Sequence, residues 1–232
     1  MDHQDSGGAG IPVVFLHAAT GHSAMWEHQL PAFTSAGYRC IAFDRSAEGF
    51  ASDQLEALAA KLALPRFHLV GTAAGAIIAV DYSLSHAPRL RSLVLANTIV
   101  GVQDADYLEL SQRLRPSPQF DKLPADFREL GPSYRAANAE GTKRWNALAK
   151  ARPRVSYTMR NHITYAALET IKLPTLLLTG DADLYMPPSV LRLFAARIRG
   201  CQSVVIPECG HSAYWEQPET FNRAVLEFLA KH

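Results

Sequence analysis

Short apolar runs alternate with amphipathic stretches through the first hundred residues. The first of them, Ile11 to Leu16, is apolar and rich in β-branched residues, which is typical of a strand buried on both faces. The runs cover Ile11 to Leu16, Tyr38 to Phe43, Phe67 to Val70 and Leu93 to Ala96. Helical spacing fills the intervals, through Trp26 and Leu30 to Ala36, from Leu55 to Leu64, and from Ala74 to His86. This alternation predicts a mostly parallel, doubly wound sheet with helices on both faces.

The rhythm changes between Gly101 and Ile171, where no β-branched run occurs and the pattern is helical throughout. The helices expected there are Ala105 to Leu114, Ala125 to Leu130, Gly141 to Ala151 and His162 to Thr170. Strands then return at Leu176 to Thr179 and Ser203 to Ile206, with helices at Val190 to Ile198 and from Pro218 onward. We therefore expect an α/β core formed by residues 1–100 and 171–232, with an inserted helical cap at 101–170.

Charge is spread evenly over the chain except in this cap. The whole chain has a formal net charge of +1, which gives no reason to expect a nucleic acid partner. From Asp104 to Tyr165, however, eleven Lys and Arg face seven Asp and Glu, a local excess of about four positive charges. A solvated helical face accounts for such an excess, and an anion-accepting lid is the alternative.

Length and composition describe an ordinary globular protein. The 232 residues are 48% hydrophobic, enough to bury the core of one sizeable domain. The sequence contains neither an 18-residue apolar run nor an apolar N-terminal stretch, so neither a membrane span nor a signal peptide is expected. The three cysteines are odd in number and lack metal-ligand spacing, which favours a reducing, cytoplasmic location. No metal and no cofactor are expected.

The turn between the third strand and the helix that follows it has the spacing of a nucleophile elbow. Gly71 and Gly75 flank Ala73 as in G-x-S-x-G, the motif in which a strained strand-to-helix turn lifts a serine hydroxyl above a sheet. The expected strain places Ala73 at a positive φ. Because alanine occupies the nucleophile position, the frame of a hydrolase is present without its attacking group.

Four segments, taken in order, resemble the α/β-hydrolase superfamily, and together they span nearly the whole chain. They are Leu16-His17 with its small-residue loop, Gly71-Thr72-Ala73-Ala74-Gly75, Gly180-Asp181-Ala182-Asp183 with Pro187, and Gly210-His211-Ser212 with Glu216-Gln217-Pro218-Glu219. They are similar to the family's oxyanion loop, elbow, acid loop and histidine loop, in the order expected for this fold. The resemblance implies an α/β-hydrolase fold and a small-molecule substrate or ligand.

Site roles carry over from the resemblance by position. His211 would be the general base, and Asp183 the acid that orients it, preferred to Asp181 because the family's acid is the second of the pair. The backbone N–H groups of Ala19 and Ala74 would form the oxyanion hole. The loop residues could instead be turn formers, with His211 a hydrogen-bonded loop histidine.

A methyl group cannot attack a carbonyl, so covalent catalysis through Ala73 is excluded. In subtilisin, loss of the serine costs about 10⁶ in turnover. Three possibilities stay open: an inactivated Ser-to-Ala form of a serine hydrolase, a natural protein that uses the His211–Asp183 pair without a covalent intermediate, and a ligand-binding protein without catalysis. In the first two, the chemistry would be hydrolase-like, on an ester, lactone or related small organic substrate.

The start of the chain departs from the family pattern as well. Ten residues before Ile11 leave no room for the antiparallel hairpin that usually precedes this strand. The strand from Tyr38 to Phe43 would then be a sheet edge with unpaired backbone groups. We expect either a cover from the first ten residues or pairing with a second subunit, which would make a homodimer through this edge.

Overall fold

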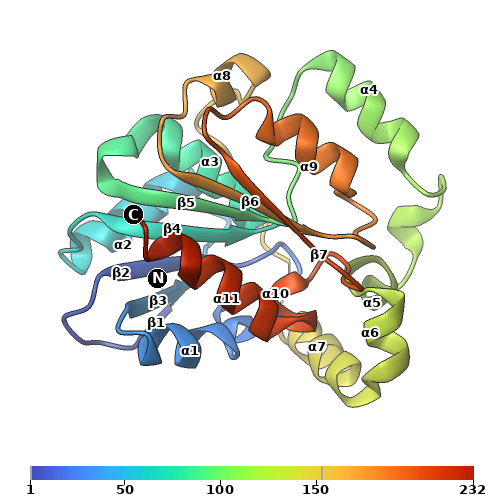
Figure 1. Ribbon diagram of the computed structural model, residues 1–232, viewed down its shortest axis with the longest axis horizontal. Coiled ribbons are helices and arrows are strands. Elements are labelled where there is room, and N and C mark those ends of the chain that lie inside the picture. Colours follow the sequence, from blue (N-terminus) through green and yellow to red (C-terminus); the bar gives the residue numbers. More distant parts are fainter. Residues whose placement is uncertain (1, 153) are drawn as a thin grey trace.

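A seven-stranded sheet runs through the computed structural model, which describes residues 2–152 and 154–232 (Figure 1). Met1 and Pro153, which fall in the ranges expected for core and cap, lie outside the described residues. The strands are β1 (His3–Asp5), β2 (Pro12–Leu16), β3 (Arg39–Phe43), β4 (Phe67–Thr72), β5 (Leu90–Ala96), β6 (Thr175–Gly180) and β7 (Gln202–Ile206). Their order in the sheet is β1-β3-β2-β4-β5-β6-β7, and all pairs except β1 with β3 are parallel. The predicted fold class, a mostly parallel doubly wound sheet, is confirmed.

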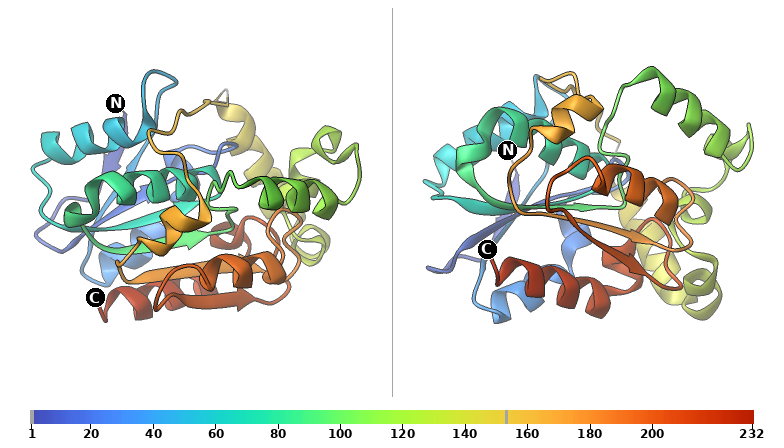
Figure 2. Two further views of the ribbon diagram at one scale, coloured as in Figure 1. Left: turned by 90° about the horizontal axis from the view of Figure 1, so that it is seen from above. Right: turned by 45° about the horizontal axis from the view of Figure 1, so that its top comes forward.

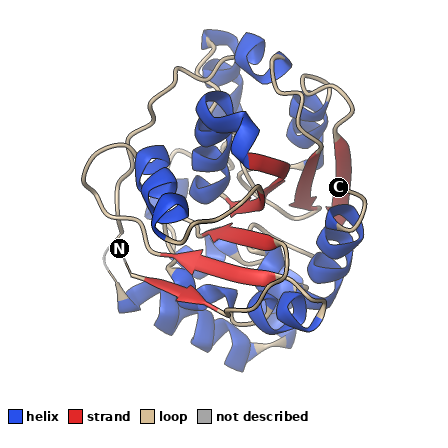
Figure 3. Ribbon diagram, turned by 90° about the vertical axis from the view of Figure 1, so that its left-hand side faces the viewer, coloured by secondary structure: helices blue, strands red, loops and turns tan. Residues whose placement is uncertain are grey.

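Helices cover the sheet on both sides (Figure 3). The α-helices are α1 (Gln29–Ser35), α2 (Ala51–Lys61), α3 (Ala74–His86), α4 (Ala105–Leu114), α5 (Ala125–Glu129), α6 (Pro132–Ala137), α7 (Ala139–Ala151), α8 (Tyr165–Glu169), α9 (Pro188–Ala195), α10 (Ala213–Glu216) and α11 (Pro218–Leu229). Short 3₁₀ turns η1 (Ser23–Trp26), η2 (Ala87–Arg89) and η3 (Phe120–Lys122) complete the helical elements described.

The core is divided by the sheet into two apolar clusters. Along β2, Val14 and Leu16 face one cluster with α2, α3 and α9, while Val13 and Phe15 face the other with α1 and α11. Successive side chains of a strand point to opposite faces, so a strand covered on both faces is apolar along most of its length. This pattern explains why the strand predictions were close to the observed bounds.

The sheet edge formed by β3 is covered from within the chain. The short strand β1 pairs antiparallel with β3, with Gln4 opposite Ala42, and Asp5 forms an ion pair with Arg39 at 2.6 Å. Of the two expected covers, the structure therefore has the one from the first ten residues. The homodimer remains a prediction.

The segment 101–170 lies between β5 and β6 and contains α4 to α8. Helices α4 to α7 gather at the right of Figure 1, the end toward which the parallel strands point, and Figure 2 shows the same grouping from two further sides. The chain returns along α3, where the Asp81 carboxylate accepts hydrogen bonds from the N–H groups of Arg160 (3.1 Å) and Asn161 (2.8 Å).

Several helix bounds differ from the prediction. The helix expected from His162 begins only at Tyr165, because the Thr164 side chain caps it by accepting a hydrogen bond from the Ala167 N–H at 3.1 Å. Helix α6 was not predicted. This short helix meets the longer α7 at Asn138, whose side chain caps α7.

Candidate active site

Ala73 has the backbone strain that the elbow spacing predicts. It joins β4 to α3 with φ 49° and ψ −116°, outside the regions that alanine normally adopts. The flanking glycines are required by space: a Cβ on Gly71 would lie 2.6 Å from Ala76 Cα, and one on Gly75 only 2.1 Å from Leu16 O. The predicted geometry of this turn is thus confirmed.

A cavity of about 160 Å³ opens beside Ala73, and most of its wall is apolar. It brings together residues from six separate parts of the chain: Ala19, Ala73, Ala74, Ile77, Asn97, Thr98, Ile99, Tyr157, Tyr185 and His211. Four of the five predicted site residues line it directly. The fifth, Asp183, lies behind His211, with its side chain fully buried.

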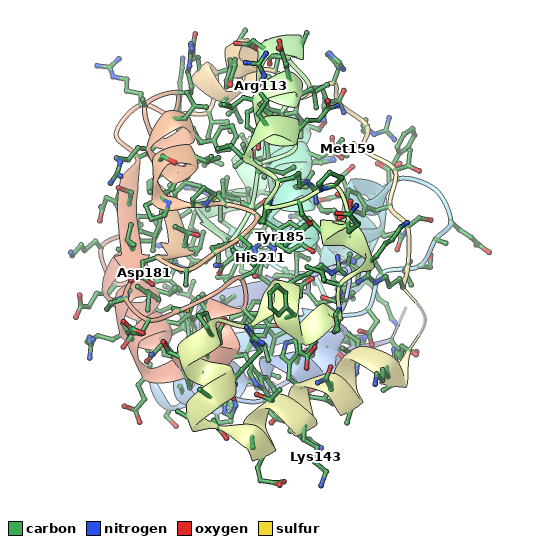
Figure 4. All side chains as sticks on the ribbon, turned by 90° about the vertical axis from the view of Figure 1, so that its right-hand side faces the viewer. Arg113, Lys143, Met159, Asp181, Tyr185 and His211 are labelled. Atoms are coloured by element: carbon green, nitrogen blue, oxygen red, sulfur yellow. The ribbon has the colours of Figure 1, made fainter. Side chains whose placement is uncertain are left out.

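Asp183 holds the imidazole of His211. The two carboxylate oxygens lie 2.8 and 2.9 Å from His211 Nδ1, within the usual range of hydrogen bonds. A carboxylate accepts hydrogen bonds, so the Nδ1–H donates and the neutral ring keeps its lone pair on Nε2. Figure 4 shows His211 beside Tyr185, whose ring centroid lies 4.5 Å from that of the imidazole.

Further donors fix the carboxylate itself. Asn97 Nδ2 and Thr179 Oγ1 donate to Asp183 Oδ2 at 3.1 and 3.0 Å. The backbone N–H groups of Tyr185 and Met186 donate to Oδ1 at 2.8 and 2.9 Å. Asp181, the alternative acid, is instead exposed and accepts from the Cys209 N–H. The geometry therefore favours Asp183 over Asp181.

Burial and charge act in opposite directions on the His211–Asp183 pair. Burial disfavours a charged imidazole, but the adjacent Asp183 charge and hydrogen bond outweigh it and raise the pKa of His211 to about 8. Burial likewise disfavours the charged carboxylate, yet the histidine and the N–H donors keep the pKa of Asp183 below its ordinary value. His211 therefore takes up a proton at a higher pH than an unperturbed histidine does.

A second buried carboxylate, that of Glu216, clamps the loop on which His211 lies. Glu216 Oε2 accepts from the N–H groups of Gly131 (2.7 Å) and Gly210 (2.9 Å), and Oε1 accepts from that of Ser212 (3.1 Å). The residues on both sides of His211 are thus bound to one side chain. Since Gly131 belongs to the segment 101–170, the same carboxylate ties that segment to the histidine loop.

On the opposite wall, the loop after β2 is held by a buried arginine. Arg45 Nη1 donates to His17 O at 2.7 Å and Nη2 to Ala18 O at 3.1 Å. Burial and the Arg45 charge lower the pKa of His17 to about 3, so this histidine stays neutral. No partner for the Ala19 N–H occurs among residues 2–152 and 154–232, and the N–H of Ala74 lies in the first turn of α3, where intrahelical acceptors are missing.

Two other side chains near the turn do not reach the cavity. Thr72 is buried, and its hydroxyl has no hydrogen-bond partner among the described residues. The Cys209 thiol is buried, and its pKa is raised by that burial and by neighbouring carboxylates, so it is not a thiolate. Neither lines the cavity with Ala73 and His211.

Sequence reasoning missed Asn97, Tyr157 and Tyr185 as residues of the cavity wall. Asn97 follows the carboxyl end of β5, a position from which a side chain reaches the site in a parallel sheet, and this signal was available. Tyr157 belongs to the return stretch of the helical segment, where no local pattern indicates a site. Tyr185 lies in the acid loop, but nothing in the sequence distinguishes it from a structural tyrosine.

Within residues 2–152 and 154–232, no cluster of three or more His, Cys, Asp or Glu could hold a metal ion. Over the same residues, no helix is both long enough and apolar enough to cross a membrane.

The sequence and the fold match a known family. The model of a family described as "Alpha/beta hydrolase family" matches residues 13–224, and the chain belongs to that family. BpoC of Mycobacterium tuberculosis, named as a proposed non-heme bromoperoxidase, is 30% identical over 97% of this chain and 96% of its own. Its crystal structure superimposes with a TM-score of 0.79, covering 99% of this chain and 95% of that one.

Other relatives are named as hydrolases. A 2-hydroxy-6-oxononadienedioate/2-hydroxy-6-oxononatrienedioate hydrolase of Paraburkholderia xenovorans is 26% identical over 99% of this chain and 90% of its own. The crystal structure of a hydrolase from Pseudomonas aeruginosa has 25% identity and a TM-score of 0.80, covering 98% of this chain and 93% of that one. The chain is therefore hydrolase-like, in sequence as in fold.

Proposed function

We propose that this protein hydrolyses a small ester, lactone or related carbonyl substrate by activating water with His211, without a covalent acyl-enzyme. One observation carries the proposal: the imidazole held by Asp183 at 2.8 Å lines the same cavity as the Ala73 methyl group. The hydrolase names of the relatives support the reaction class. The apolar wall of the cavity suits an uncharged reacting group.

The reaction proceeds through one tetrahedral intermediate. His211 Nε2 takes a proton from a water molecule, whose oxygen adds to the carbonyl carbon of the substrate. The carbonyl oxygen becomes an oxyanion, which the N–H groups of Ala19 and Ala74 stabilise. The intermediate collapses, and His211 returns the proton to the leaving oxygen, so that an acid and an alcohol form. Asp183 holds the tautomer and stabilises the imidazolium in between.

The rate enhancement that the proton-transfer step can supply is limited. Positioned general-base catalysis contributes about 10²–10⁴-fold. A serine enzyme also forms a covalent intermediate, so the wild-type protein is expected to be slow beside a family member with serine at position 73. The protein with Ala73→Ser would gain the missing nucleophile within a turn that already has the required strain.

The experiment compares wild type, His211→Ala and Ala73→Ser on one panel of esters and lactones, with ligand binding measured alongside. Under the proposal, wild type turns over a substrate, and His211→Ala abolishes turnover while affinity changes by no more than a few-fold. Activity that appears only in Ala73→Ser points to an inactivated serine hydrolase. If all three proteins are inert and a small molecule still binds wild type and His211→Ala equally, the chain is a binding protein on a hydrolase scaffold.

A further inference from the structure

A second, smaller cavity adjoins the one that contains His211. It measures about 60 Å³ and shares Ile99 and Tyr185 as wall residues with the first. Its other walls come mainly from the end of α4 and the residue before Tyr185, with the exposed side chains of Leu114 and Leu184 at its rim. Arg115, which ends α4, is the one charged residue that lines it among the described residues.

The Arg115 guanidinium lies against Tyr185 and has donors to spare. Its carbon is 5.7 Å from the Tyr185 ring centroid and 5.6 Å from that of Phe120. Within the described part of the chain, its one hydrogen bond goes from Nη1 to Asp121 Oδ1 at 2.8 Å. The side chain of Asp121 is 71% exposed, so this ion pair is screened by water. The remaining N–H groups of the guanidinium are available to another acceptor.

A second arginine reaches the same tyrosine from its hydroxyl end. Arg128 Nη1 donates to the Tyr185 hydroxyl oxygen at 2.7 Å, and no acceptor for the hydroxyl hydrogen occurs among the described residues. Burial raises the pKa of the carboxyl of Glu129, the next residue. Two cations and an unused O–H donor therefore surround one ring, and both arginines belong to the segment that carries the excess of positive charge.

We propose that the small cavity beside Arg115 binds a carboxylate at the far end of the substrate, so that this protein acts on carbonyl compounds that carry a terminal acid group. This inference rests on the proposed hydrolysis and names its substrate class. Arginine is suited to the role because its planar N–H groups match the two oxygens of a carboxylate.

Geometry limits the length of that substrate. The ring of Tyr185 lies close to both groups, with its centroid 4.5 Å from that of His211 and 5.7 Å from the Arg115 guanidinium carbon. The two distances together separate base and guanidinium by no more than about 10 Å. An extended chain advances about 1.2 Å per bond. Allowing for a hydrogen bond of about 2.8 Å at the arginine, at most about five carbon atoms fit between the reacting carbonyl and the carboxylate.

Binding tests the subsite without relying on turnover. Adipamate, which carries a carboxylate and an amide separated by four methylene groups, is compared with neutral adipamide by titration calorimetry. We expect adipamate to bind wild type about tenfold more tightly, as a hydrogen bond to a charged group suggests. Arg115→Met should erase this preference. Arg113→Met, the matched control on an exposed arginine that pairs with Glu109, should leave it unchanged.

Turnover provides the second readout. We expect the mono-4-nitrophenyl ester of adipic acid to have a kcat/KM about tenfold above that of 4-nitrophenyl hexanoate. Arg115→Met should lower the value for the acidic ester and leave the neutral ester unaffected. Asp121→Asn should raise affinity for adipamate, because it removes the carboxylate that competes for Arg115.

The outcomes separate the two proposals. If neither ester is hydrolysed but adipamate binding depends on Arg115, the carboxylate subsite stands and the proposed hydrolysis fails. If both esters are hydrolysed at similar rates and Arg115→Met changes neither, hydrolysis stands and the subsite is overturned. Equal binding of adipamate and adipamide to wild type overturns it as well.

Discussion

The titration of His211 is the most direct measure of whether Asp183 prepares a base. The imidazole has a pKa of about 8, against about 6.5 for an unperturbed histidine. At about 1.36 kcal/mol per pKa unit, this difference corresponds to about 2 kcal/mol of preferential stabilisation of the imidazolium. Replacing Asp183 by Asn removes the main opposing influence. Burial, which lowers the pKa more than the carboxylates of Glu129 or Glu216 each raise it, should then bring the pKa below 6.5.

The sign of the effect on stability follows from the same shift. The pKa of His211 is higher in the folded protein than in the unfolded chain, so the charged pair contributes its full stabilisation below pH 6.5 and loses it as pH rises through about 8. A general base must be neutral, so activity should rise over the same interval. Stability and turnover are therefore expected to change in opposite directions between pH 6.5 and 8.

The assay is an NMR titration of the histidine ring resonances, together with urea unfolding at pH 6 and pH 9. Wild type should titrate near 8 and Asp183→Asn below 6.5, with the pH-dependent part of the stability reduced in the variant. Asp181→Asn removes an exposed carboxylate two residues away and should leave the His211 titration unchanged. A wild-type midpoint at or below 6.5, or the same midpoint in Asp183→Asn, would refute the argument.

Three further predictions follow from the contacts described above. Glu216→Gln should speed hydrogen exchange at the backbone N–H groups that the carboxylate binds, those of Gly131, Gly210 and Ser212. The glutamine side chain would turn its own NH₂ donor toward at least one of these N–H groups. Glu219→Gln, at an exposed position, is the control. Gly75→Ala places a Cβ 2.1 Å from Leu16 O and should lower the free energy of unfolding by more than about 3 kcal/mol. Urea unfolding measures this loss, and an unchanged midpoint would contradict the packing described. Deleting residues 2–6 removes β1 and bares the edge of β3, so self-association should increase in analytical ultracentrifugation, whereas a strictly monomeric variant would show that the edge needs no cover.

Local pattern alone was sufficient for most of the sheet and for the elbow. A strand buried on both faces needs a largely apolar run, and a tight strand-to-helix turn needs small residues on either side. Both features can therefore be recognised from residues that are adjacent in the sequence. The bounds of α3 (Ala74–His86) and α4 (Ala105–Leu114) were predicted to the residue. The strain at Ala73 followed from the two glycines.

Strand β1 shows where local pattern fails. His3, Gln4 and Asp5 are polar and carry no strand signal of their own. They become a strand because β3 offers unpaired backbone groups and Arg39 offers a partner for the Asp5 carboxylate. Pairing of this kind depends on the neighbour and not on the segment itself.

The candidate site, like the fold, could be predicted from the sequence only in part. Spacing and order along the chain located Ala73, Asp183 and His211, whereas only the folded chain brings Asn97 against Asp183, 86 residues away, and Gly131 against Glu216, 85 residues away. The pKa of His211 and the stack of Arg115 on Tyr185 are likewise products of burial and distance, which a sequence does not contain. The sequence determined which residues could perform the chemistry. The tertiary structure decided which charges and rings surround them, because those interactions act through space between segments far apart in the chain.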